Sequence, residues 1–380
     1  MEVQVLLVYV AFFVSLVLGL MIIPSIVVIA NKKRLMDTID ERKEHTTPTP
    51  RLGGISFFPI ALITFCFLLG LRFFWGYYFS SDYSTDLVQQ FMFIATALAT
   101  IFMLGIADDL VGVGYVYKFA IQLICAALLV AAGVRITDLG GLFAIAEIPK
   151  WVSIPLTIIL VVFIINAYNL IDGINGLCSG LSILTLTSFA FWFVSVGNLI
   201  YAMLIMSFVG VIFAFFYFNA VGKKMSIFMG DTGSLTIGLL ISFISFKFIA
   251  LTNSSPFYAH FYCPIAVVLG LIFIPVFDAM RVFVSRLRRG KHPFEADRTH
   301  IHHKLLDVGF THIQSTFVLL ILQMFFALFN LVLSQYFMLN INIVVGLDVF
   351  IILSLLFFLN RTINKGIKLI NKRCQEKKGL

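Results

Sequence analysis

Hydrophobic residues run along this chain in long blocks, and short polar stretches separate them. Eleven blocks are long enough to cross the hydrocarbon core of a bilayer as a helix, which takes about 20 apolar residues. They lie at 4–30, 54–72, 88–106, 119–137, 152–168, 177–197, 199–219, 233–251, 263–280, 313–336 and 342–360. The pattern predicts an all-α polytopic integral membrane protein with about eleven transmembrane helices.

Composition and charge support this class and predict an orientation. Of the 380 residues, 60% are hydrophobic and 12% are charged, which is too apolar for an ordinary soluble domain. The loops expected on one side carry 23 of the 27 Lys and Arg residues. Positively charged loops stay cytoplasmic, so we expect the N-terminus outside and the C-terminus in the cytoplasm. The first block begins with Glu2 and is expected to remain as a membrane helix, not a cleaved signal peptide.

No long linker or repeat divides the chain. We expect a single transmembrane catalytic domain over residues 1–360, followed by a basic cytoplasmic tail at 361–380. The net charge of +8 is attributed to orientation and contact with anionic membrane lipids, not to nucleic-acid binding. An apolar bundle of this size could also form a homodimer.

Four carboxylates stand at the expected cytoplasmic ends of helices. Asp108, Asp109, Asp172 and Asp231 come from three different loops, yet the predicted topology places all of them on one membrane face. Carboxylates at membrane boundaries often mark ion or substrate sites. Four that repel one another favour a divalent cation.

The first of these motifs is ADDLVGVGYVYK, in which Lys118 follows the acidic pair by ten residues. A solvated helix end is one interpretation of Asp108 and Asp109. The other is an acid pair that binds Mg²⁺ or acts as a base, with Lys118 as a point charge for phosphate.

Two further motifs combine polar residues with glycine. In NAYNLIDGINGL, Asn166 and Asn169 share a helix face, which fits interhelical hydrogen bonds, or else amide groups that ligate Mg²⁺ and read a nucleobase. Asp172 would then lie beside transferred phosphates. In FMGDTGSL, Asp231 or Thr232 could be a helix N-cap. A helix N-terminus also attracts phosphate, and a carboxylate at that place makes sense if Mg²⁺ bridges it to a pyrophosphate. We therefore favour Asp231 as a metal ligand.

The densest group of ionisable residues is HPFEADRTHIHH. His300, His302 and His303 could bind Zn²⁺ or form a solvated loop. We favour a third interpretation, in which these imidazoles and Arg298 hold anionic phosphates.

Two other patterns have mainly structural interpretations. TPTPRLGGI is predicted to be a rigid turn before the second helix, where Arg51 could add a phosphate contact. Asp278 and Arg281 lie one helical turn apart, which predicts an ion pair within the helix.

Five motifs together carry a family resemblance. In order along the chain, they are ERKEHTTPTPRLGGI, ADDL with Lys118, NAYNLIDGINGL, FMGDTGSL and PFEADRTHIHH. This set resembles the polyprenyl-phosphate N-acetylhexosamine-1-phosphate transferases, whose members start peptidoglycan, O-antigen and teichoic-acid linkage synthesis. The ADRTHIHH form is most similar to the GlcNAc-1-phosphate transferases.

The resemblance implies a reaction and its reactants. The expected donor is a UDP-sugar, most simply UDP-GlcNAc, and the acceptor is undecaprenyl phosphate in the bacterial inner membrane. A lipid-phosphate oxygen would attack the β-phosphorus and UMP would leave at the cytoplasmic face. The implied cofactor is Mg²⁺, for which Mn²⁺ can substitute.

The resemblance also implies roles for individual residues. Asp231 would bind Mg²⁺ with Asn169 as its partner, and Asp108, Asp109 and Asp172 are the candidate catalytic carboxylates. Substrate-binding candidates are Lys118 and Arg298 at the pyrophosphate, Asn166, Asn175 at the uracil side, and His300, His302 and His303 at the phosphate end.

One position departs from many bacterial members, which have DGIDGL or DGLDGL. This chain has Asn175 in DGINGL, so any mechanism that needs a carboxylate there is excluded. Two other classes of protein fit the sequence less well. An ion-coupled transporter would also use intramembrane carboxylates, but it would place them near the midplane. A phosphotransferase using CDP-linked donors would carry its acidic motif in one short stretch, which is absent from this sequence.

Overall fold

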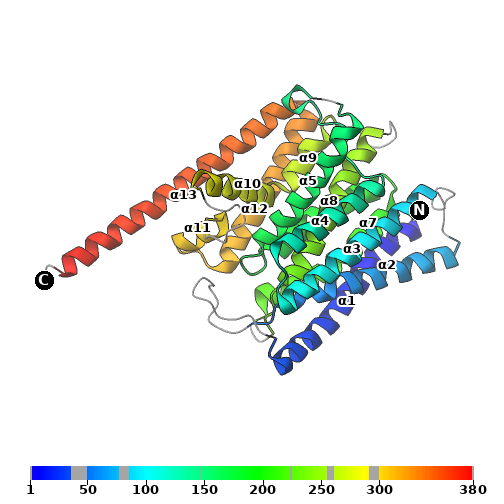
Figure 1. The fold of residues 1–380 in the computed structure, drawn as a ribbon, viewed down its shortest axis with the longest axis horizontal. Coiled ribbons are helices and arrows are strands. Elements are labelled where there is room, and N and C mark those ends of the chain that lie inside the picture. The colour runs from blue at the N-terminus through cyan, green and yellow to red at the C-terminus, as the bar shows by residue number, and fades with distance from the viewer. Residues whose placement is uncertain are drawn as a thin grey trace.

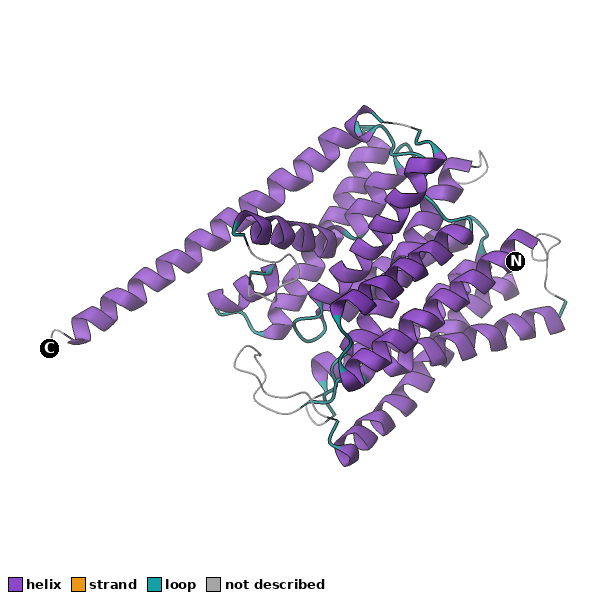
Figure 2. Ribbon diagram, viewed as in Figure 1, coloured by secondary structure: helices purple, strands orange, loops and turns teal. Residues whose placement is uncertain are grey.

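The computed structural model describes residues 2–35, 49–76, 85–145, 147–222, 225–254, 261–290 and 299–378. Within these ranges every regular element is a helix, and loops join the helices (Figure 2). The α-helices are α1 (Glu2–Lys33), α2 (Phe57–Phe74), α3 (Thr85–Val111), α4 (Tyr115–Ala131), α5 (Lys150–Ile171), α6 (Leu177–Ser195), α7 (Leu199–Phe216), α8 (Gly230–Ser254), α9 (Pro264–Leu271), α10 (Phe273–Arg288), α11 (Ile301–Val308), α12 (His312–Leu331) and α13 (Ile341–Lys378). Short helical turns are η1 (Gly53–Ser56), η3 (Leu142–Ala144), η4 (Tyr217–Val221) and η5 (Val332–Tyr336). The predicted all-α class is confirmed.

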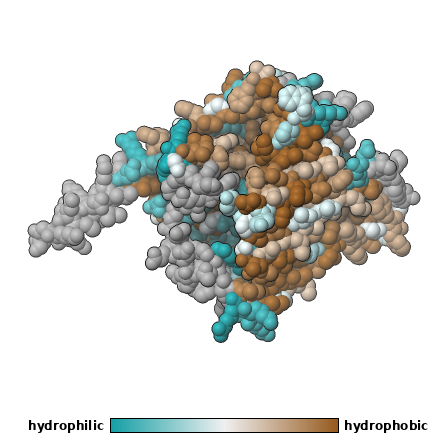
Figure 3. All heavy atoms as spheres, in the orientation of Figure 1, coloured by the Kyte–Doolittle hydropathy of each residue, from teal (hydrophilic) through white to brown (hydrophobic). Residues whose placement is uncertain are grey.

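The helices are of the length and polarity that a membrane requires. Nine spans in the described part of the chain are long and apolar enough to cross, and the bent pair α9 and α10 would make a tenth. The apolar helix α4, of 17 residues, covers most of the span predicted at 119–137. Hydrophobic residues dominate the face of the bundle in Figure 3, and hydrophilic residues gather toward its two ends. A polytopic membrane protein is confirmed, whereas eleven crossings remain a prediction.

The span predicted at 263–280 is instead two helices, α9 and α10, which meet at an angle of 77° around Ile272. Such a break frees backbone groups that lipid cannot satisfy. Gln323 of α12 compensates, because its Oε1 accepts the N–H of Ile274 at 2.9 Å and its Nε2 donates to the carbonyl of Leu271. Thr185 of α6 also donates to the Leu271 carbonyl, at 2.7 Å. Neighbouring helices therefore stabilise the bend.

The central helix is α8, which packs against α3, α5 and α6 (Figure 1). Every residue from Thr232 to Phe246 is buried. Its first turn contacts other backbones closely, since a Cβ on Gly105 of α3 would overlap the backbone of Thr232, and one on Gly54 of η1 would overlap Gly233. These glycine contacts allow α3 and η1 to approach the start of α8 closely.

Residues 50–54, which precede α2, form backbone hydrogen bonds with the segment that leads into α8. The carbonyl of Pro50 accepts the N–H of Phe228 at 2.8 Å, and Gly53 and Gly54 donate to the carbonyls of Phe228 and Met229 at 2.9 and 2.8 Å. The rigid turn predicted from TPTPRLGGI is therefore confirmed over its described residues, 49–55, while Thr47 and Pro48 lie outside them.

Replacing Gly105 with Ala should test the close approach of α3 and α8. The added methyl group has no space beside Thr232, so we expect a loss of about 1–3 kcal/mol of stability from overpacking. Thermal unfolding in detergent measures this loss. Gly70→Ala is the matched control, because Gly70 also lies in a helix but has nothing within 4 Å of the place that its new methyl group would take. Equal unfolding temperatures for the two variants would contradict the packing argument.

Candidate active site

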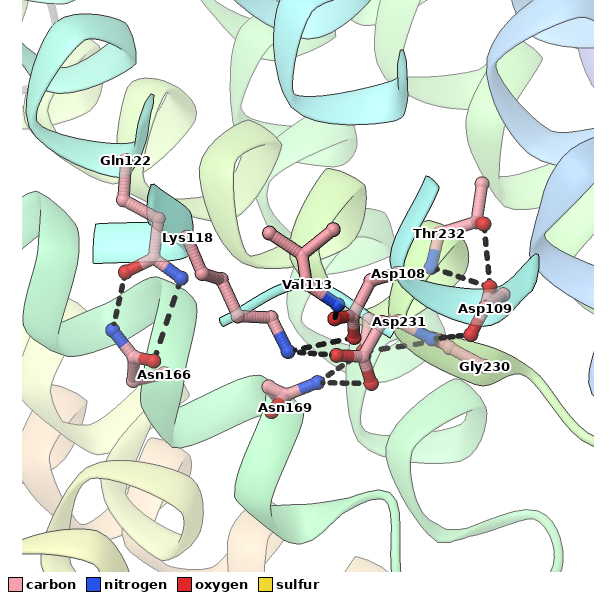
Figure 4. Close-up of polar contacts among 11 residues, drawn as sticks. Asp108, Asp109, Val113, Lys118, Gln122, Asn166, Asn169, Gly230, Asp231 and Thr232 are labelled. Atoms are coloured by element: carbon pink, nitrogen blue, oxygen red, sulfur yellow. Dashed lines mark hydrogen bonds and ion pairs between the residues drawn. The ribbon is translucent and has the colours of Figure 1, made fainter. Parts of the chain in front are cut away.

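Four helix ends meet at one cluster of polar side chains (Figure 4). Helix α3 ends just before Gly112, whose φ of +75° suits the turn, and α4 begins soon after, at Tyr115. Lys118 in the first turn of α4 therefore faces back toward Asp108. Its Nζ donates to Asp108 Oδ2 at 2.9 Å and to Asp231 Oδ2 on α8. One ammonium group thus bridges carboxylates from two different helices.

The two neighbouring carboxylates at the end of α3 have different partners. Asp108 Oδ1 accepts the N–H of Val113 at 2.8 Å, which closes the turn after α3. Asp109 instead accepts the N–H groups of Asp231 and Thr232 at 2.8 and 2.9 Å, and the Thr232 hydroxyl at 2.5 Å. Asp109 therefore caps the N-terminus of α8 from another helix, where a negative charge also interacts favourably with the helix dipole.

Asp231 does not serve as the N-cap of α8, because it lies inside the first turn of the helix. Its carboxylate is held by Lys118 on one side and by Asn169 on the other. Asn169 Nδ2 donates to Asp231 Oδ1 at 3.0 Å and to Ser234 Oγ at 2.9 Å. The sequence did not single out Ser234, although its position three residues after Asp231 places both on one helix face.

Asn166 lies one turn before Asn169 but joins a different pair. Its Nδ2 donates to Gln122 Oε1 of α4 at 2.7 Å, and Gln122 Nε2 donates back to Asn166 Oδ1 at 3.4 Å. This exchange ties α5 to α4 beside the cluster. Interhelical hydrogen bonds, one of the two interpretations of these asparagines, are thus present at both residues, and those of Asn169 lie within the cluster.

The donor atoms of the cluster suit a hard divalent cation. Asp231 and Asn169 carry the oxygen ligands that Mg²⁺ takes, and Mg²⁺ commonly binds one or two carboxylates and completes its shell with water and substrate phosphate. Lys118 already brings a positive charge against Asp231. Among the described residues, no group of three or more His, Cys, Asp or Glu could hold a metal ion. This finding applies to the described histidines and carboxylates alike.

Asp172 follows α5 directly and lies near the cluster. Burial raises its pKa well above the usual range, and the charges of Asp231 and Asp109 raise it further, while Arg51 acts in the opposite direction. Asp172 therefore lies close enough to Asp231, Asp109 and Arg51 for their charges to change its pKa.

The turn between α5 and α6 is anchored at its far end. The backbone carbonyl of Asn175 accepts the Thr316 hydroxyl of α12 at 2.8 Å, and the N–H of Gly176 donates to Asn219 Oδ1. Gly176 has a φ of +78°, which favours glycine. The Asn175 side chain is half-buried on this turn.

The histidine segment packs against the same turn. His302 of α11 is buried, and a Cβ on Gly173 would overlap its imidazole. The His303 ring lies 4.3 Å from the His302 ring, and the His300 ring stacks on His302 at 5.5 Å. Three of the predicted phosphate-end residues are therefore together, beside Gly173, which follows Asp172 in the chain. Arg298, predicted to act with them, lies outside the described residues.

His302 should make the stability of the fold depend on pH. Burial and the charge of His303 lower its pKa to about 3, against about 6.5 for a free histidine. The folded state excludes a proton that the unfolded chain binds below about pH 6.5, so stability is full above that pH and falls toward pH 3. We expect the free energy of unfolding to fall below pH 6.5 by up to about 1.4 kcal/mol per pH unit, which lowers the unfolding temperature in detergent. His302→Gln should flatten this slope, and parallel curves would contradict the assignment.

Comparison with known proteins gives the family. The model of glycosyl transferase family 4 matches residues 91–249, which contain the clustered ends of α3, α4, α5 and α8. A probable undecaprenyl-phosphate N-acetylglucosaminyl 1-phosphate transferase of Bacillus subtilis (strain 168) is 31% identical over 352 residues, 92% of this chain and 89% of the relative. The chain belongs to glycosyl transferase family 4, and the resemblance noted from its motifs is confirmed.

Two further relatives extend the comparison. A decaprenyl-phosphate N-acetylglucosaminephosphotransferase of Mycobacterium tuberculosis (strain CDC 1551 / Oshkosh) is 31% identical over 72% of this chain and 69% of its own length. An undecaprenyl-phosphate alpha-N-acetylglucosaminyl 1-phosphate transferase of Yersinia pestis is 29% identical, over 77% of this chain and 75% of its own length. All three relatives are named as transferases, and none supports the transporter alternative.

Proposed function

We propose that the protein transfers GlcNAc-1-phosphate from UDP-GlcNAc to undecaprenyl phosphate and releases UMP. A lipid-phosphate oxygen forms a bond to the β-phosphorus, and the bond from this phosphorus to the bridging oxygen breaks, so UMP leaves with that oxygen. The observation that carries the proposal is the cluster of Asp108, Lys118, Asn169 and Asp231 in a chain of this family. The names of the relatives supply the acceptor and the sugar phosphate.

The residues of the cluster divide the work of bringing two anionic reactants together. Lys118 can exchange a carboxylate for a phosphate oxygen, because its three N–H donors lie on a flexible stem. Asp231 and Asn169 would hold Mg²⁺, which when bound neutralises charge on the pyrophosphate. Asp109 holds the start of α8 and so fixes Asp231. Phosphoryl transfer depends mainly on such positioning and charge stabilisation, so a base at Asp108 or Asp172 would add only the last proton transfer.

The membrane arrangement completes the proposal. We infer eleven crossings, with α4 and the bent α9 and α10 pair included, an outside N-terminus and a cytoplasmic C-terminus in the bacterial inner membrane. The cluster then lies at the cytoplasmic face, where the nucleotide is available. The lipid phosphate reaches it from the bilayer.

UMP release by purified protein in detergent tests the proposal. The assay contains Mg²⁺, undecaprenyl phosphate and a panel of UDP-sugars that differ at the acetamido group and at the 4-hydroxyl. We expect release that requires both the lipid phosphate and a divalent cation, with UDP-GlcNAc as the best donor. Release with another UDP-HexNAc would correct the sugar. A folded protein that releases no UMP with any donor would contradict the proposed function.

A further inference from the structure

Asp278 of α10 is a buried carboxylate that the proposed reaction does not yet use. Its side chain is 1% exposed. Arg281 Nη2 donates to Asp278 Oδ1 at 2.7 Å, which confirms the predicted ion pair within the helix. The structure adds two partners from the histidine segment. His300 Nδ1 lies 2.9 Å from Asp278 Oδ2, and the N–H of Ile301 donates to both carboxylate oxygens at 3.2 Å.

These contacts determine which nitrogen of the His300 ring carries a proton. The ionised carboxylate of Asp278 can only accept hydrogen bonds, so His300 Nδ1 carries a proton. The other ring nitrogen, Nε2, is then the atom that can bind a ligand. Arg281 also donates to the carbonyl of Thr299, so the backbone that leads into α11 is held on both sides of His300.

The imidazole of His302 lies between His300 and the turn beside the candidate active site. Its imidazole is nearly parallel to that of His302, with 5.5 Å between the ring centres and 10° between the planes. His302 in turn packs on Gly173, which follows Asp172 in the turn after α5. A shift of His300 would therefore change the packing at the turn beside the cluster.

We propose that Asp278 is a positioning residue for the phosphoryl transfer. It holds His300 with a proton on Nδ1 and directs Nε2 toward the substrates, and in the doubly protonated ring Nε2–H donates to their anionic phosphates. This inference rests on the proposed function. Carboxylates that orient a functional histidine through its other nitrogen recur in enzymes, and removing such an outer partner typically costs about 10- to 100-fold in activity or affinity. Hydrogen bonding and the charge of His300, and then the Arg281 guanidinium, keep the buried carboxylate of Asp278 charged.

The direct test is a double-mutant cycle of Asp278→Asn and His300→Ala. The Asn amide can accept the Ile301 N–H through its oxygen, but its NH₂ group would face His300 Nδ1 and favour the opposite tautomer. We expect Asp278→Asn alone to lower kcat for UMP release about 10- to 100-fold. In the His300→Ala background the same change should cost less than about twofold, because its effect passes through His300. An equal further loss in that background would mean that Asp278 only docks α11, and would overturn the inference.

A second measurement does not depend on turnover. The ¹⁵N shifts of histidine-labelled protein, with the His300 signals assigned by their loss in His300→Ala, report which ring nitrogen carries the proton. We expect a protonated Nδ1 that is lost in Asp278→Asn and kept in Asp278→Glu, which retains a carboxylate. An unprotonated Nδ1 in the wild type would overturn the inference. Absent UMP release by a wild type with protonated Nδ1 would contradict only the proposed function.

Discussion

Asp231→Asn is expected to lower UMP release about a thousandfold, the loss that follows when a group stabilising transition-state charge is removed. The substitution keeps the size of the side chain but removes its charge. Asp231 is the residue that contacts both Lys118 and Asn169, so its carboxylate links the cation and the amide of the cluster. Without that charge, Lys118 keeps only Asp108 as a carboxylate partner, and the proposed divalent cation loses its principal ligand. Steady-state kinetics at saturating Mg²⁺ measure the loss.

A matched control for Asp231→Asn is Asp307→Asn. Asp307 is an exposed carboxylate on α11, so its loss should change kcat less than about twofold. Thermal unfolding of both variants separates lost chemistry from lost structure. If Asp231→Asn retained more than about a tenth of wild-type activity, the assignment of Asp231 as the principal metal ligand would be wrong, since such groups are worth far more.

The sequence predicted which segments gather, because hydropathy and charge decide which ends of the helices share a membrane face. It could not predict the break between α9 and α10. The hydropathy of segment 263–280 does not distinguish a straight helix from a bent one. The bend depends on hydrogen bonds with Gln323 and Thr185, which lie in other helices. Local pattern carries no information about such tertiary partners.

Within the site, the motifs predicted the participants but not their pairing. Adjacent helical residues point about 100° apart, so one of Asp108 and Asp109 must face away from the other's partner. Only the packing of α3 on α8, fixed by Gly105, decides that Asp109 caps α8 while Asp108 contacts Lys118. The link from Asp278 to His300 likewise depends on where α11 docks.

The ammonium group of Lys118 contacts Asp108 and Asp231, and a divalent cation bound at this cluster would be attracted by the same carboxylates. Lys118→Met is therefore expected to have two effects. UMP release should fall about a thousandfold, because one compact positive charge between the substrates and Asp108 and Asp231 is lost. Mg²⁺ should also raise the unfolding temperature of this variant more than that of the wild type, since the two carboxylates have lost their ammonium partner.

Lys118→Arg separates charge from geometry at the same position. It keeps the positive charge, but a planar guanidinium cannot replace a compact ammonium group between two carboxylates without moving them. We expect a smaller loss of kcat than in Lys118→Met, and a Mg²⁺ response close to that of the wild type. Lys32→Met, at the exposed end of α1, controls for loss of a positive charge on this chain. Full activity in Lys118→Arg would mean that charge alone matters at residue 118, and that the compact geometry of the ammonium group contributes nothing to the reaction.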